Sequence, residues 1–146
     1  MKGSAATVVP SENPAFSDQL KDICADGVDM YFDMVAGDIS DGVFPLMNNR
    51  GRIAQIGTAS VASWTVPPLA PRRERLILIK ELRHQGCIVN NHSDLFPDAW
   101  ALLGKLIGTG ELKHREDIFD GIESAPDALM SLYAGSNTGK TLVRLL

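Results

Sequence analysis

The order of apolar segments along the chain predicts an α/β fold, in which a parallel sheet carries helices on both faces. Strand-like and helix-like segments alternate from residue 5 to residue 107, and this alternation is typical of βαβ units, which join parallel strands by right-handed crossovers. The strand-like segments are almost continuously apolar, as expected for strands covered on both sides. After residue 108 a strand–helix–strand tail follows, so we divide the chain into 1–108 and 109–146.

Each predicted strand is a short apolar or β-branched run between turn residues. The strands fall at residues 5–9, 28–35, 51–57, 86–90 and 141–145, with a further extended stretch over 111–119. Each predicted helix has apolar residues on one face and a recognisable start or stop. The helices fall at residues 13–27, 39–47, 72–83, 97–107 and 124–135. Asn13 and Ser124 are the expected N-caps, and Pro45 is expected either to kink the second helix or to limit its start.

The composition excludes several classes of function. A net charge of -4 over 146 residues argues against a dedicated nucleic-acid binder, and no apolar run approaches the roughly 20 residues that span a bilayer. Cys24 and Cys87 lie in apolar contexts far apart in the sequence, which favours reduced core residues. The histidines His84, His92 and His114 lack metal-ligand spacing. We therefore expect a cytoplasmic protein that binds no nucleic acid, membrane or metal.

One segment nearly reproduces a phosphate-binding P-loop. It runs from Ala134 to Thr141, with alanine in place of the usual first glycine. A P-loop needs a strand before it and a helix after it, because the amides at the start of that helix hold the phosphates. Here a helix is predicted before the segment and a strand after it, so a helix C-cap and turn is the favoured interpretation. Gly108 and Gly110 form a G-x-G that also follows a helix, and we interpret it as a helix terminator.

Several segments, taken in order, resemble one family. They are residues 27–38, 51–57, Pro67 and Pro68 with 81–83, then 110–117, 121–126 and 137–140. Together they resemble the zinc-independent medium-chain dehydrogenases/reductases, which include prostaglandin and leukotriene reductases, plant alkenal double-bond reductases and bacterial curcumin reductases. The likeness covers nearly the whole chain in the correct order. Each segment alone is a weak signal, and the set is specific.

The resemblance implies an NADP-dependent oxidoreductase that reduces the activated carbon–carbon double bond of enones and enals, by hydride transfer from NADPH and then protonation. It also implies that residues 1–108 correspond to the C-terminal part of a Rossmann-like cofactor-binding domain. Residues 109–146 would correspond to part of the catalytic, GroES-like domain. The glycine-rich loop and most of the substrate domain would precede Met1, so we expect weak or no NADP(H) binding and no activity from the isolated chain.

The resemblance carries cofactor contacts onto particular positions and assigns no catalytic residue. The cofactor-binding positions are Ile56, Gly57, Thr58, Ala59 and Ser60 after one strand, Cys87, Ile88 and Val89 after another, and the late Asn137. Two polar contacts of the family are absent, because an asparagine is replaced by Met34 and a tyrosine by Ala62. A methionine cannot supply the donors and acceptor of an amide.

Two classes of function remain open at this point. The first is a reductase fragment, and the second is a non-catalytic dimerising module from a truncated reductase gene. In the family the strand that corresponds to the segment from Gly86 to Asn90 pairs with its symmetry mate, so the resemblance implies a homodimer. This segment is apolar and contains no proline or inward charge, so little opposes edge pairing.

Overall fold

The computed structural model describes residues 7, 9, 11, 13–61, 66 and 69–145, and the chain divides into two compact units. The first unit is Met1–His92 and the second is Ser93–Leu146. The sequence-based division at residue 108 differs from this one, because the long helix before residue 108 clusters with the C-terminal elements. The predicted strand at residues 5–9 lies largely outside the described residues.

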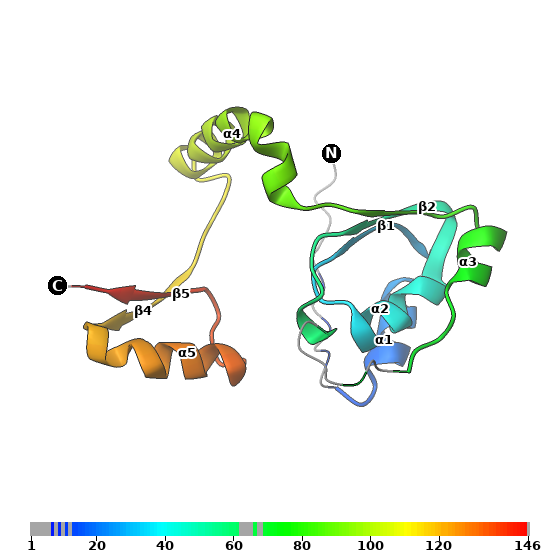
Figure 1. The fold of residues 1–146 in the computed structure, drawn as a ribbon, viewed down its shortest axis with the longest axis horizontal. Coiled ribbons are helices and arrows are strands. Elements are labelled where there is room, and N and C mark those ends of the chain that lie inside the picture. The colour runs from blue at the N-terminus through cyan, green and yellow to red at the C-terminus, as the bar shows by residue number, and fades with distance from the viewer. Residues whose placement is uncertain are drawn as a thin grey trace. The chain divides into compact units, whose positions relative to one another are not determined.

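The first unit is built on a parallel three-stranded sheet (Figure 1). Its strands are β1 (Val28–Asp33), β2 (Met47–Gln55) and β3 (Arg83–Gly86), in that spatial order. Its helices are α1 (Phe16–Ile23), α2 (Gly37–Val43), continued by a 3-10 helix (Phe44–Leu46), and α3 (Glu74–Ile79), and a 3-10 helix (Ala59–Val61) follows β2. The prediction of an α/β fold with a parallel sheet is confirmed.

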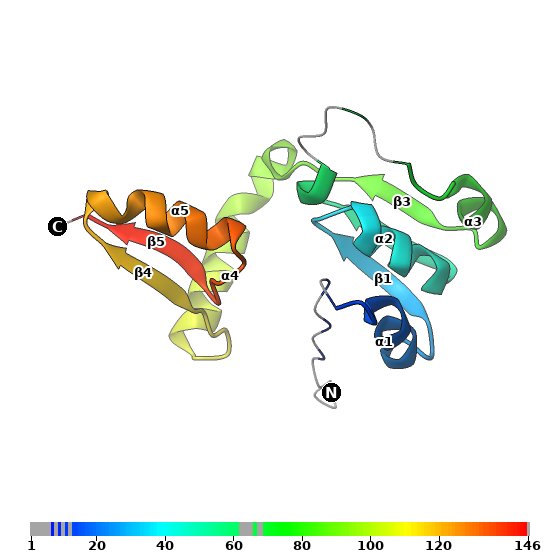
Figure 2. The same ribbon diagram turned by 90° about the horizontal axis from the view of Figure 1, so that it is seen from below.

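One face of this sheet carries the hydrophobic core. Phe44, Met47 and Ile53 are almost fully buried, and they cluster with Val43 and Leu82. Leu20 of α1, Tyr31 of β1, and Leu76 and Ile77 of α3 pack against the same cluster. The helices α1 and α2 lie on the same side of the sheet (Figures 1 and 2). Within the first unit, the packing that the sequence predicts for both faces is therefore concentrated on one face.

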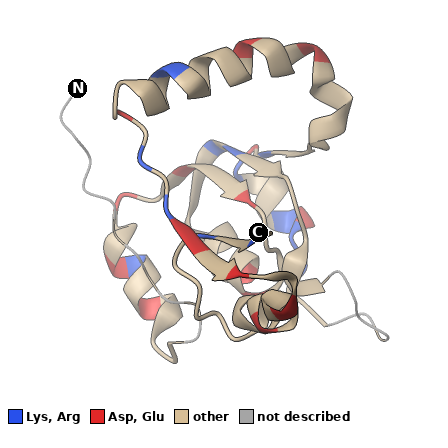
Figure 3. Ribbon diagram, turned by 90° about the vertical axis from the view of Figure 1, so that its left-hand side faces the viewer, with Lys and Arg blue, Asp and Glu red and all other residues tan. Residues whose placement is uncertain are grey.

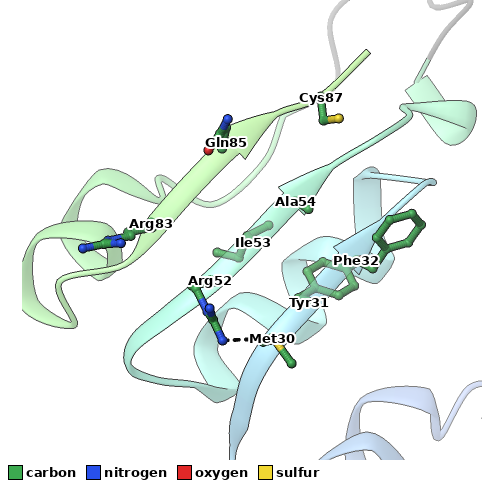
Figure 4. A pocket seen from close by; sticks show the side chains of 9 residues that line it. All are labelled: Met30, Tyr31, Phe32, Arg52, Ile53, Ala54, Arg83, Gln85 and Cys87. Atoms are coloured by element: carbon green, nitrogen blue, oxygen red, sulfur yellow. Dashed lines mark hydrogen bonds between the residues drawn. The ribbon is translucent and has the colours of Figure 1, made fainter. Parts of the chain in front are cut away.

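The opposite face of the sheet is open and forms a shallow groove of about 600 Å³ (Figure 4). Alternate residues of the strands point into it, as the period-2 geometry of a strand requires. They are Met30 and Phe32 of β1, Arg52 and Ala54 of β2, and Arg83, Gln85 and Cys87 at β3. Met30 and Phe32 remain about two-thirds exposed (68% and 64%), although strands of a parallel sheet are normally covered.

Four predicted elements of the first unit are corrected. The strand predicted at 51–57 begins earlier, since β2 runs over Met47–Gln55. The predicted second helix ends before Met47, because the 3-10 helix that contains Pro45 leads directly into β2. The helix predicted over 72–83 shortens to α3. The strand predicted from Gly86 to Asn90 instead occupies Arg83–Gly86, and a 3-10 helix (Val89–Leu95) follows. Register explains this shift, because Arg83 pairs with Arg52 and the pairing ends at Gly86 with Gln55.

The second unit contains a strand–helix–strand motif, as the sequence predicts. The helix α4 (Phe96–Gly108) is followed by β4 (Glu116–Asp120), a 3-10 helix (Ile122–Ser124), α5 (Ala125–Tyr133) and β5 (Lys140–Arg144). The strands β4 and β5 pair in parallel. Only Asp98 and Lys105 are charged within α4, and few of its residues are coloured in Figure 3. None of the described helices is long and apolar enough to cross a membrane.

The end of α5 matches the prediction better than its start. Gly135 follows the helix with a left-handed φ of 62°, the expected C-terminal conformation. Ser124 occupies the N-cap position but does not cap α5 with its side chain. Its hydroxyl donates instead to the Gly121 carbonyl at 2.8 Å.

Candidate cofactor site

The carboxyl ends of the three parallel strands meet at one edge of the first sheet, because parallel strands run in the same direction. The segment after β1 bonds directly to the segment after β2. The amides of Ile56 and Gly57 donate to the Asp33 carbonyl at 2.7 and 3.2 Å, and the Ser60 amide donates to the Val35 carbonyl at 2.9 Å. In open α/β sheets, ligands bind in the crevice outside this edge.

The segment after β3 joins the same edge. The Cys87 amide donates to the Gln55 carbonyl at 2.9 Å, which extends the link between β2 and β3 beyond the last strand residue. Ile88 and Val89 follow directly and are exposed. The structure thus brings eight of the predicted cofactor positions to one edge, five after β2 and three after β3. Their proposed role in cofactor binding stays a prediction.

Asp33 is the side chain that organises the turn after β1. It is 1% exposed, and its Oδ1 accepts the amides of Val35 at 3.0 Å and Ala36 at 2.8 Å. Its Oδ2 accepts the hydroxyl of Ser40, which lies in the first half of α2. The Ser40 hydroxyl also lies 3.4 Å from the hydroxyl of Tyr31. Burial by itself would raise the pKa of Asp33, but the donors around it hold that pKa below its usual value, so the carboxylate is charged near neutral pH.

Gln55 has the corresponding role after β2. Its side-chain amide donates to the Gly57 carbonyl at 2.6 Å, which shapes the turn that carries Ile56 to Ser60. Its amide oxygen lies 3.2 Å from Nε2 of His84 on β3. Burial, and then the positive charge of Arg73, lower the pKa of His84, so this ring is neutral near pH 7. A neutral ring at this position can donate to Gln55 without bringing a charge to the edge.

The turn after β1 contains one of the three non-glycine residues with a positive φ among the described residues, the others being Arg50 and Glu81. Ala36 has φ 62° and ψ -158°, a region that only glycine occupies without strain. Residues in such conformations persist only where their surroundings over-determine them, and they cluster at functional sites. Close approach also constrains Gly57, because a Cβ there would lie 2.6 Å from the Met34 carbonyl oxygen. The two turns are therefore closely packed and specifically shaped.

The remaining predicted positions are one residue of the second unit, one residue beside the edge turns and one residue outside the described part of the chain. Asn137 lies in the second unit, in the turn before β5, and its side-chain amide donates to the Gly139 carbonyl at 3.1 Å. Met34 stands beside the edge turns and is 59% exposed. Ala62, where the family resemblance places a tyrosine, lies outside the described residues. Sequence reasoning missed Asp33 and Gln55, although an aspartate at the end of a mostly apolar strand was a signal.

The P-loop-like segment has its amides occupied by a side chain. The amides of Thr138 and Gly139 donate to the Asp117 carboxylate at 2.6 and 2.9 Å. The segment follows α5 and leads into β5, the reverse of the order that phosphate binding needs. The interpretation as a helix C-cap and turn is confirmed by this geometry. In the part of the chain that the structure describes, no group of three or more His, Cys, Asp or Glu residues is placed to hold a metal ion.

The fold and the edge define a class, the α/β domains that bind ligands at the carboxyl edge of a parallel sheet. A family model described as zinc-binding dehydrogenase matches residues 4–143. The chain belongs to this family, within the zinc-independent medium-chain dehydrogenases/reductases, and corresponds to a C-terminal portion of their fold. The resemblance inferred from the sequence is thereby confirmed.

Three relatives illustrate the match. A Bacillus subtilis protein, YfmJ, whose name describes an NADP-dependent oxidoreductase, is 40% identical over 129 residues, which cover 86% of this chain and 38% of that protein. The NADPH-dependent curcumin reductase of Escherichia coli is 33% identical over 135 residues, 89% of this chain and 39% of the relative. The crystal structure of CurA from Vibrio vulnificus in complex with NADPH superimposes with a TM-score of 0.84 at 31% identity, over 94% of this chain and 42% of that one. The chain thus spans about two-fifths of the length of these relatives.

Proposed function

We propose that this chain supplies part of the NADP(H) site of a reductase acting on enones and enals, and that the 146 residues alone do not catalyse the reaction. The observation that carries the proposal is the convergence of the segments after β1, β2 and β3 at one edge, held by bonds such as that from the Ser60 amide to the Val35 carbonyl. The names of the relatives support NADP(H) as the ligand, and curcumin is itself a conjugated enone.

The cofactor would supply hydride, and the chain would supply position and surroundings. The backbone amides and carbonyls at the edge are the groups suited to orient a nicotinamide or ribose there. The pyrophosphate needs a glycine-rich loop that opens a helix. The 146 residues contain no G-x-G-x-x-G segment, so the strongest anchor of a dinucleotide is absent from them.

Titration of isotope-labelled chain with NADP⁺, followed by amide NMR, tests cofactor binding. We expect a dissociation constant on the order of 1 mM, or about -4 kcal/mol, with shift changes at Gly57, Ser60 and Cys87. Asn137→Ala should weaken binding, while the matched variant Asn49→Ala, at an exposed position of β2, should not. Micromolar binding that Asn137→Ala leaves unchanged would place the ligand elsewhere.

An absorbance assay with NADPH and an enone tests the second half of the proposal. We expect no turnover above the uncatalysed rate, because a hydride donor that is held loosely gains little from proximity and orientation. Robust turnover by the purified chain would show that the missing anchor is dispensable.

A dimerising module is the second candidate function, and the position of β3 favours it. This strand is at the edge of the sheet and pairs only with β2 among the described strands. Pairing of two β3 strands would give one continuous sheet with two-fold symmetry. Sedimentation equilibrium at tens of micromolar protein should give the mass of a dimer, whereas a clean monomer would argue against edge pairing.

A further inference from the structure

Asp33 and Gln55 form the last in-register pair of β1 and β2, and together they fasten all three edge segments. The carboxylate of Asp33 holds the turn after β1, while its carbonyl accepts two amides from the turn after β2. The side-chain amide of Gln55 holds the turn after β2, while its carbonyl accepts the amide of Cys87 after β3. Each residue thus bonds to the turn that follows its own strand and to the turn that follows the neighbouring strand.

Both side chains point into the covered side of the sheet, away from the open groove. Asp33 contacts Ser40 of α2, and Gln55 contacts His84, whose ring edge packs against Phe44 of the core at 5.3 Å between centroids. Neither side chain lines the open groove drawn in Figure 4. Their polar atoms bond to backbone groups of the turns and to Ser40 and His84, so a ligand at the edge would meet the shaped backbone.

The strained conformation of Ala36 indicates that the surrounding contacts impose the shape of the turn after β1. Its amide donates to Asp33 at 2.8 Å, so the carboxylate helps to hold a backbone geometry that alanine disfavours. A fixed backbone raises affinity because binding then requires no ordering of the loop. A loosened turn would have to be reordered at each binding event, which weakens affinity without removing any contact to the ligand.

We propose that Asp33 and Gln55 are positioning residues for the nicotinamide dinucleotide: they fix the turns at residues 34–36 and 56–60 in the conformation that receives the ligand. This inference rests on the proposed function, since it concerns the same edge. It adds two residues that lie behind the predicted contact positions, Asp33 buried and Gln55 half-buried. The mechanism is preorganisation, with the ligand touching only the turns.

The test compares three single variants in the full 146-residue chain, with NADP⁺ as the probe. Gln55→Met keeps the length of the side chain and removes the bond to the Gly57 carbonyl. Gln85→Met makes the same change on β3, where the side chain points to the open groove. Ser40→Ala removes the donor to Oδ2 of Asp33 and leaves the two amide bonds to Oδ1 in place. Binding is measured by NMR and stability by urea unfolding.

We expect Gln55→Met to weaken NADP⁺ binding about fivefold, the factor that one net hydrogen bond corresponds to, and to shift the amide signals of Ile56 to Ser60 in the free protein. Gln85→Met should leave the affinity unchanged. Ser40→Ala should lower the urea midpoint while the affinity of the folded protein stays the same, because titration of a folded population does not report stability.

Three outcomes would overturn the positioning role or the proposed function on which it rests. Unchanged affinity in Gln55→Met, with wild-type binding intact, would refute positioning by Gln55 while leaving the proposed function standing. An equal loss of affinity in Gln55→Met and Ser40→Ala would show that any loosening near the edge weakens binding, and it would refute a specific positioning role for Asp33 and Gln55. No binding of NADP⁺ to the wild type at tens of millimolar would refute the proposed function itself. Asp33→Asn provides a second variant, expected to weaken binding in the same way.

Discussion

Replacing Asp33 with asparagine changes the charge of the buried carboxylate and little else. The two groups have nearly the same shape, so any loosening of the turn after β1 would follow from the loss of charge. Asparagine retains the Oδ1 acceptor for the amides of Val35 and Ala36, which lie 3.0 and 2.8 Å away. Its Nδ2 takes the place of the Oδ2 that accepts the Ser40 hydroxyl, and that hydroxyl can rotate to become the acceptor.

The expected loss of stability follows from the strength of these bonds. A hydrogen bond to a charged group contributes about 1.5 to 3 kcal/mol, and a neutral one about 1 kcal/mol. Neutralising the acceptor therefore costs about 1 kcal/mol for each of the two amide bonds. Relief from burying a charge offsets part of this cost. We expect Asp33→Asn to lower the free energy of unfolding by about 1 to 2 kcal/mol at pH 7.

The dependence on pH identifies the carboxylate as the cause. The pKa of Asp33 in the folded state lies below its usual value, so its stabilisation is fully present above the pKa of an unfolded aspartate, about 3.9. It is lost as the pH falls through the folded-state pKa. The difference in unfolding free energy between wild type and Asp33→Asn should therefore be constant from pH 7 to about pH 5 and shrink below about pH 4.

Urea unfolding followed by circular dichroism, repeated across this range of pH, measures the difference directly. Asp22→Asn, on the exposed side of α1, is the matched control and should change stability by less than about 0.5 kcal/mol. A difference for Asp33→Asn that stays the same down to pH 2 would show that shape rather than charge holds the turn. A difference below about 0.5 kcal/mol at pH 7 would refute the role given to this carboxylate.

Two further substitutions probe the same edge. Gly57→Ala should destabilise the protein by about 2 kcal/mol, because its Cβ would lie 2.6 Å from the Met34 carbonyl oxygen. The control Gly104→Ala, in α4 with open space around it, should stabilise the protein by up to about 1 kcal/mol. Equal effects of the two variants in urea unfolding would contradict the close approach at Gly57. Met34→Asn restores the amide that the family resemblance places there and should tighten NADP⁺ binding about fivefold. An unchanged dissociation constant in the NMR titration would show that residue 34 lies away from the ligand.

The parts of the fold that sequence reasoning predicted correctly are those with a strong local signal. The segment that forms β1 is mostly apolar and follows Gly27, and α4 is predominantly apolar with Pro97 at its start. The strand β3 was misplaced because its residues include arginine, histidine and glutamine, whereas the apolar segment that follows it is exposed. Pairing with β2 determines which residues form this strand, and strand pairing is not a property of the local sequence.

The candidate site divides in the same way. The resemblance and the rule for parallel sheets both point to the carboxyl edge, so residues 56–60 and 87–89 could be named from the sequence. The hydrogen bonds that shape the edge could not be predicted from the sequence. Asp33 and Ser40 are separated by half a helix, and Gln55 is linked to His84 across a crossover of 29 positions. Ala36 also looks ordinary in the sequence, and only its φ of 62° shows the strain.

The open face of the first sheet bears on which assembly the chain should form. Met30 and Phe32 are exposed there, so burial of this face would be favourable. Arg52 and Arg83 are cross-strand partners on the same face, and no acidic residue lines the groove among the described residues. Two copies packed face to face would bring four like charges together, which opposes that arrangement. Pairing through β3 joins edges rather than faces, so it would bring only Arg83 of each copy to the seam and leave Arg52 away from it. Edge pairing leaves the groove open, so an edge-paired dimer should still expose Met30 and Phe32. A partner that combines apolar groups with negative charge would complement this face.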